Sequence, residues 1–134
     1  MGEGGMRDPA GQEGGAAPLL DVVFLGELHD SCGRSLLVAL AESAEQESAG
    51  LFEALDQHVE KRDAEGCEAA VHALKGTGAG VGLAQFQMQS EAMLIAISQG
   101  RLPSPMEAKA LQQCWRDGFA AYCIYVSNAE EDCA

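Results

Sequence analysis

Three residues of this sequence combine a nucleophile, a cation and an empty space at helical spacing: His72, Lys75 and Gly76. Residues three and four positions apart are neighbours on a helix surface, so a helix here would place both beside the imidazole. A neutral imidazole nitrogen is a nucleophile, and a lysine ammonium can pair with the oxygens of a phosphoryl group. The missing side chain of Gly76 leaves room beside the ring. The spacing therefore predicts an accessible histidine that could react with a phosphoryl group.

The apolar stripe of the same helix does not include His72. That stripe consists of Cys67, Ala70, Val71, Leu74 and, further along, Val81. A lone histidine is most often structural or simply solvated. Here the position beside the stripe disfavours a core role, and the small neighbours Ala69, Ala73 and Gly76 leave the ring exposed.

The remaining histidines and the cysteines indicate no further chemistry. His29 lies in a break between helices and His58 near the end of a long helix, as turn and core-edge residues would. Five cysteines form no Cys-x-x-Cys or zinc-finger spacing, which favours reduced thiols in a cytoplasmic protein. Glu68 precedes His72 by four residues, whereas metal-binding bundles use Glu-x-x-His. We expect no metal ion, no cofactor and, without a Gly-x-x-x-x-Gly-Lys-Ser/Thr loop, no ATP site.

Length and charge narrow the class of protein. A chain of 134 residues, 47% of them hydrophobic, suffices for one domain with a single core. The net charge of −13 argues against binding to nucleic acid or to anionic membranes. No apolar run of 18 residues and no signal peptide occur in the sequence. We expect a cytoplasmic monomer, since one bundle can bury the apolar stripes.

The pattern of residues 19–61 predicts two helices. Residues 1–18 are rich in glycine and without period, which is typical of a flexible tail or linker. A short helix is expected over 19–28, with a break at Asp30, Ser31 and Gly33. A long acidic helix should follow over about 35–61, because apolar residues recur there at three- and four-residue steps.

Three more helices are expected in the second half. Asp63 should cap a helix that ends or distorts within 76–82, where four glycines would each cost roughly 1 kcal/mol. The next should span about 83–98 and the last about 105–126, followed by an acidic tail over 127–134. In the helix over 83–98, the residues expected to point inward are Phe86, Ser90, Met93, Leu94 and Ile97. The pattern predicts an all-α protein, an antiparallel four-helix bundle with a short additional N-terminal helix.

The residues around His72 resemble the signature of a known family. The run from His72 to Gly76, with the small residues that follow it up to Val81-Gly82-Leu83, is similar to the motif of histidine-containing phosphotransfer (HPt) domains. The acidic helix before the motif and the two helices after it match as well. The resemblance covers about 19–126.

The resemblance implies a phosphorelay intermediate without catalysis of its own. His72 would accept a phosphoryl group from a receiver-domain aspartate, in the family generally on Nε2, and pass it to another receiver domain. Lys75 would compensate the phosphoryl charge and Gly76 would provide steric access. Glu68, Ala69 and Ala79 would contribute to the docking surface.

The implied partners are response-regulator receiver domains and a hybrid sensor histidine kinase, with Mg²⁺ on the receiver. Some family members place a glutamine near the histidine from the following helix. Here that position is Leu94, which departs from the pattern. The alternative is a non-catalytic helical module that docks a signalling partner without being phosphorylated; the presence of His72, Lys75 and Gly76 together disfavours it.

Overall fold

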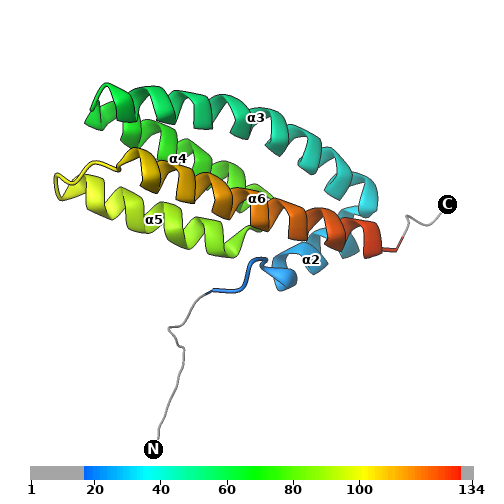
Figure 1. Cartoon of the computed structure of the whole chain (residues 1–134). Helices are drawn as coiled ribbons and strands as arrows, with labels where there is room; N and C mark the ends of the chain where they lie inside the picture. Colours follow the sequence, from blue (N-terminus) through cyan, green and yellow to red (C-terminus); the bar gives the residue numbers. More distant parts are fainter. Residues whose placement is uncertain (1–16, 131–134) are drawn as a thin grey trace, which may run out of the picture.

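A computed structural model describes residues 17–130, which form five helices and no strand (Figure 1). In chain order, the helices are α2 (Val22–Cys32), α3 (Arg34–Glu60), α4 (Ala64–Gly80), α5 (Ala84–Ser98) and α6 (Pro105–Asn128). The last four pack as an antiparallel bundle in which α3 contacts α4 and α6, and α5 contacts the same two helices. The predicted all-α fold, a four-helix bundle with a short N-terminal helix, is confirmed.

Side-chain caps determine where several helices begin. The Asp63 carboxylate accepts a hydrogen bond of 3.0 Å from the Gly66 amide, which confirms the expected start of α4. At the start of α6, Ser104 and Glu107 form a reciprocal capping box, with Pro105 in the first turn. Such caps satisfy amides that a helix leaves without an internal partner.

An aromatic cluster fills the middle of the bundle. Phe52 of α3, Phe86 of α5 and Trp115 of α6 meet edge to face, with 5.2 Å between the ring centroids of Phe86 and Trp115. Phe119 stacks on Trp115 at its margin. Edge-to-face pairs of this kind stabilise a core beyond the contribution of the area that they bury.

The glycines of α4 serve two different purposes. The helix ends at Gly80, within the expected region, and so contains Gly76 and Gly78 as well. A Cβ atom on the buried Gly78 would lie 2.7 Å from Cδ2 of Phe86, whereas one on Gly76 or Gly80 would meet nothing within 4 Å. Gly78 thus lets α4 and α5 approach closely, and the other two leave open surface.

The predicted bounds of the first helix are wrong. Helix α2 begins after Asp21, whose carboxylate accepts a hydrogen bond from the Phe24 amide, and Asp30 and Ser31 lie inside it. Exposed polar residues weaken a final helical turn by only tenths of a kcal/mol. Gly33 alone ends the helix, because its φ of 83° lies in the left-handed region.

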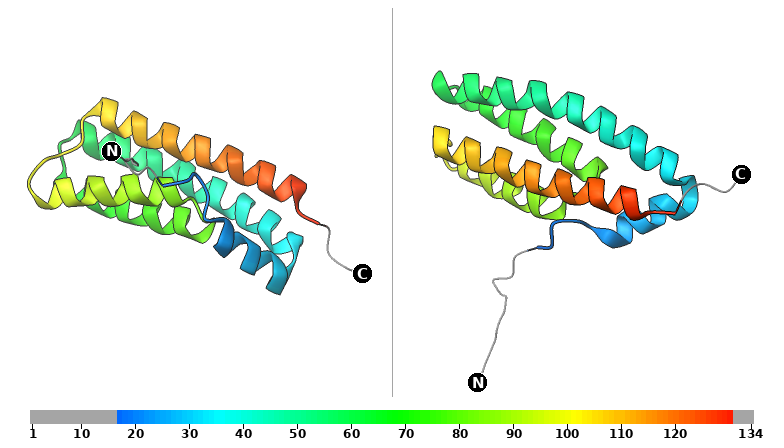
Figure 2. Two further views of the ribbon diagram at one scale, coloured as in Figure 1. Left: turned by 90° about the horizontal axis from the view of Figure 1, so that it is seen from below. Right: turned by 45° about the vertical axis from the view of Figure 1, so that its right-hand side comes forward.

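Helix α2 covers the end of the bundle where α4 connects to α5 (Figure 2). The Asp21 amide donates a hydrogen bond of 2.8 Å to the Gly82 carbonyl oxygen. A Cβ atom on Gly82 would lie 3.2 Å from side-chain atoms of Phe24 and Leu25. The same end is tied across the bundle by Arg34, whose Nε donates to the Val126 carbonyl oxygen at 3.0 Å.

At the C-terminal end, α6 continues to Asn128, two residues beyond its expected end. The expected tails lie largely outside the described residues, since these begin at residue 17 and end at residue 130.

Tyr122 provides a test of the core. It is fully buried, and its hydroxyl donates a hydrogen bond of 2.6 Å to the Leu37 carbonyl oxygen. Burial, with a smaller contribution from Cys123, raises the pKa of Tyr122 to about 12. The phenol ionises more easily in the unfolded chain, so its stabilising contribution is complete below about pH 10 and is lost as the pH rises toward 12.

We therefore expect Tyr122→Phe to lower the free energy of unfolding by about 1 kcal/mol at neutral pH. The variant should also lose less stability than the wild type between about pH 10 and 12. Denaturant unfolding at a series of pH values measures both effects, with Tyr125→Phe as the control. If the free energy of unfolding depended on pH identically in the wild type and in Tyr122→Phe, the raised pKa of Tyr122 would be contradicted.

Candidate functional site

His72 lies in a shallow groove between α4 and α5. The groove has a volume of about 530 Å³. Its lining residues are Glu65, Glu68, Ala69 and His72 from α4, and Glu91, Leu94, Ile95 and Ser98 from α5. Each set follows steps of three, four and seven residues, so each forms one helix face. The groove is the space between these two faces.

The fold directs His72 to the surface. Its neighbours Val71 and Leu74 are fully buried and hold the opposite side of α4 against the core. The imidazole is exposed, and within residues 17–130 it has no hydrogen-bond or ion-pair partner. A ring nitrogen is therefore open to a group entering from solvent.

Lys75 forms an ion pair with a residue that was not among the predicted site residues. Its Nζ atom forms an ion pair of 2.5 Å with Oε1 of Glu91 on α5. The side chains are 35% and 50% exposed, respectively. The cation expected beside His72 is present, but a carboxylate of the same groove already holds it.

The other expected site residues are placed unequally. Glu68 and Ala69 line the groove with His72, and Gly76 lies exposed one turn further along α4. Ala79 is half-buried and lies outside the lining of the groove. The expected docking residues are thus brought together only in part.

Leu94 lies level with His72 across the groove. In an antiparallel helix pair, a step forward on one helix corresponds to a step back on the other. Since Lys75 meets Glu91, the residue three positions before Lys75 faces the residue three positions after Glu91, which is Leu94. Leu94 is half-buried: it packs against the core, as predicted, and also lines the groove. An apolar side chain stands where a glutamine would offer hydrogen bonds.

The groove is acidic. Glu65, Glu68 and Glu91 contribute three carboxylates, and the neighbouring cation Lys75 is paired with one of them. Ile95, which is 48% exposed, adds an apolar contact surface on α5. A partner bound here would meet an apolar strip with negative charge on both sides.

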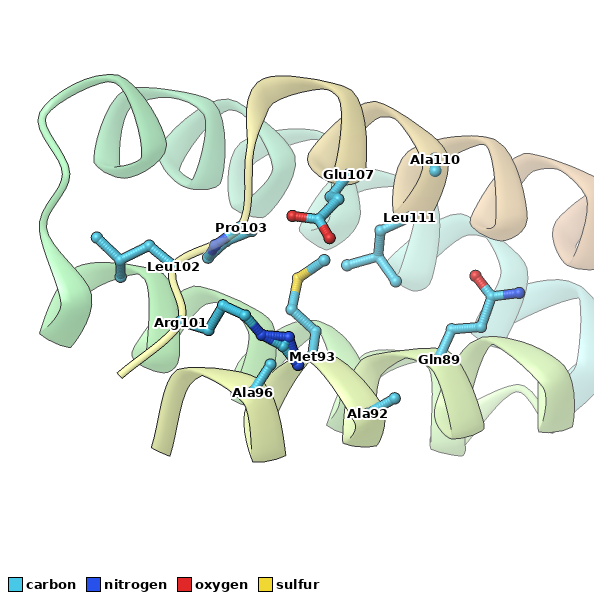
Figure 3. Close-up of a pocket in the computed structure, with 10 residues that line it drawn as sticks. All are labelled: Gln89, Ala92, Met93, Ala96, Arg101, Leu102, Pro103, Glu107, Ala110 and Leu111. Atoms are coloured by element: carbon cyan, nitrogen blue, oxygen red, sulfur yellow. The ribbon is translucent and has the colours of Figure 1, made fainter. Parts of the chain in front are cut away.

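A separate cavity lies between α5 and α6, away from His72 (Figure 3). It measures about 340 Å³, and Met93 and Leu111 project toward each other across it. The Glu107 carboxylate in its wall accepts a hydrogen bond of 2.8 Å from the Ser104 amide. The cavity has no histidine or cysteine in its lining. Met93, expected in the core, is half-buried here.

The other histidines have structural surroundings. Nδ1 of His58 lies 3.3 Å from Oδ2 of Asp63, and the ring packs so closely on Gly66 that a Cβ atom there would overlap it. Nε2 of His29 lies 2.9 Å from the Glu130 carbonyl oxygen. Over residues 17–130, no group of three histidine, cysteine, aspartate or glutamate side chains is arranged to hold a metal ion. No helix in the described part of the chain is long and apolar enough to cross a membrane.

Comparison with known proteins agrees with this geometry. The family model named Hpt domain matches residues 36–122, which include His72, all of α4 and α5 and most of α3 and α6. The chain belongs to the Hpt domain family. Hpt domains are phosphotransfer modules of two-component systems and have no ATP site of their own, so membership assigns a phosphotransfer role.

A solved structure confirms the Hpt fold. The histidine-containing phosphotransfer domain of ArcB from Escherichia coli superposes with a TM-score of 0.71 over 81% of this chain and 93% of that domain. The two sequences are 19% identical, so the likeness concerns the fold. A comparison with the sequences of curated proteins gives no match.

Proposed function

We propose that this Hpt domain accepts a phosphoryl group on His72 from the aspartate of one receiver domain and passes it to the aspartate of another. The observation that supports this most directly is the exposed imidazole of His72, free of partners in the described residues and open to a groove. Lys75 is one turn away, and Gly76 leaves open space on the same face.

In the proposed transfer, an unprotonated imidazole nitrogen of His72 attacks phosphorus in line with the aspartyl oxygen. The P–N bond forms as the P–O bond breaks, and the electron pair of that bond leaves with the aspartate carboxylate. The reverse step passes the group onward. Charge stabilisation and positioning dominate phosphoryl transfer, so an exposed nucleophile on a rigid helix suffices on this side.

The partner would supply most of the transfer apparatus. The receiver domain would hold Mg²⁺ and the phosphorylated aspartate, and we propose no cofactor for the Hpt domain itself. A hybrid sensor histidine kinase would carry the donor receiver. We further propose that the domain acts as a monomer in the cytoplasm. The acidic groove favours receivers with basic side chains around their phosphorylation site.

The alternative function is docking without phosphorylation. The acidic and apolar groove alone would serve such a module equally well. An exposed histidine with open space at Gly76 is needed only if a group is to reach the ring, which favours the phosphoryl carrier.

The deciding experiment is a transfer assay. A phosphorelay receiver domain carrying a ³²P-labelled aspartyl phosphate is mixed with the Hpt domain, and both chains are separated. We expect label on the Hpt domain that is lost in acid and retained in base, as for a phosphohistidine. Binding of the receiver without transfer of label would favour the docking module.

A further inference from the structure

The Lys75–Glu91 pair joins the two helices that form the groove. Lys75 is on α4, one turn after His72, and Glu91 belongs to the lining of the same groove. The ion pair is half-exposed and is the described interaction of the Lys75 ammonium. A carboxylate of the groove therefore already pairs with the ammonium that would compensate the charge of a phosphoryl group on His72.

We propose that Glu91 sets how strongly His72 retains a phosphoryl group, by competing with that group for Lys75. This inference rests on the proposed phosphorylation of His72. In the free domain, Glu91 compensates the charge of Lys75. After transfer, the phosphoryl group places a charge of about −2 near the same ammonium. Lys75 then has to leave Glu91 or share its donors between two anions.

Both outcomes disfavour the phosphorylated state. If Lys75 moves to the phosphoryl group, the ion pair with Glu91 is lost. If Lys75 keeps both partners, its single charge is divided between the Glu91 carboxylate and the phosphoryl group, so each anion is compensated less completely. Glu91 thus raises the free energy of phosphorylated His72 and favours onward transfer to a receiver aspartate.

Leu94 strengthens this dependence on Lys75. It faces His72 from α5 with an apolar side chain, so it offers no hydrogen bond to phosphoryl oxygens. The lining of the groove contains three carboxylates and no lysine or arginine. Lys75 is the cation placed to compensate the phosphoryl charge, and its availability is controlled by Glu91.

The test is the equilibrium constant between phosphorylated receiver and phosphorylated Hpt domain. This constant compares free species, so it does not depend on how tightly the two proteins dock. We expect Glu91→Gln to shift it toward the Hpt domain by roughly threefold, the effect of an exposed ion pair, and less at high salt. An unchanged constant, or a shift toward the receiver, would overturn the inference.

Two further variants separate competition from simple repulsion. Glu68→Gln removes a carboxylate near His72 that has no ion pair with Lys75, so it should shift the constant less than Glu91→Gln. In a Lys75→Gln background, Glu91→Gln should have little further effect. Equal shifts for both glutamates, or an undiminished shift without Lys75, would show that Lys75 is not involved and would overturn the inference.

The failure of the inference is distinct from that of the proposed function. Phosphorylation of His72 with an equilibrium constant indifferent to Glu91 would overturn the inference alone. A complete absence of label on the wild-type domain would overturn both.

Discussion

Replacement of His72 by glutamine is expected to abolish acceptance of label from a phosphorylated receiver domain. Glutamine is polar and of similar size, but it lacks a nucleophilic ring nitrogen. The residue is exposed and without a partner in the described part of the chain, so the fold should remain intact. The free energy of unfolding should change by less than about 0.5 kcal/mol. Circular dichroism and denaturant unfolding check the fold, and autoradiography checks the transfer.

The other two histidines provide matched controls. His29→Gln and His58→Gln change the same residue type at positions outside the groove, beside Glu130 and Gly66 respectively. Both should still accept label, although His58→Gln removes the contact with the Asp63 carboxylate and can lower stability slightly. Transfer to the His72→Gln variant, or its loss in the His29→Gln variant, would contradict the assignment of His72.

Gly78→Ala is expected to destabilise the protein by about 1–2 kcal/mol, although alanine normally stabilises a helix. The added methyl group would lie 2.7 Å from Cδ2 of Phe86. That ring is 1% exposed and packed edge to face on Trp115, so it cannot move aside without disturbing the aromatic cluster. Chemical unfolding monitored by Trp115 fluorescence measures the change.

Gly76→Ala is the control for the same substitution two residues earlier. Its methyl group meets nothing within 4 Å, so the variant should gain up to about 1 kcal/mol from helix propensity. Opposite signs at Gly76 and Gly78 are the expected result. Equal effects would mean that the close approach of α4 and α5 does not depend on Gly78.

Periodicity was sufficient to predict the bundle. The expected apolar stripe of α4 follows steps of three and four residues, and all of its members within the helix are buried. The bounds of α2 were less predictable, because Asp30 and Ser31 disfavour a helix only weakly. The helix ends at Gly33, whose backbone is left-handed. From the sequence alone, the two polar residues before it were equally plausible ends of the helix.

The site was predictable on one helix and only partly on the other. His72, Glu68 and Ala69 could be placed together because they share a helix face. Glu91 and Ile95 were missed, since their role depends on the register between α4 and α5. The steps from Glu91 to Leu94, Ile95 and Ser98 were visible in the sequence as a helix face, but nothing local showed which face of α4 it would oppose. The close contact between Gly78 and Phe86 is part of that register, and it joins residues of two different helices.

The glycines of α4 also bear on the rigidity of the segment that carries His72. Gly76, Gly78 and Gly80 each weaken the helix by roughly 1 kcal/mol relative to alanine, so this half of α4 has little tendency to remain helical alone. Its order comes from the neighbouring α3 and α5, against which it packs. Local unfolding of α4 is therefore coupled to loss of its contact with α5. A partner that binds to α5 and stabilises this contact would also make local unfolding of the helix that carries His72 less frequent.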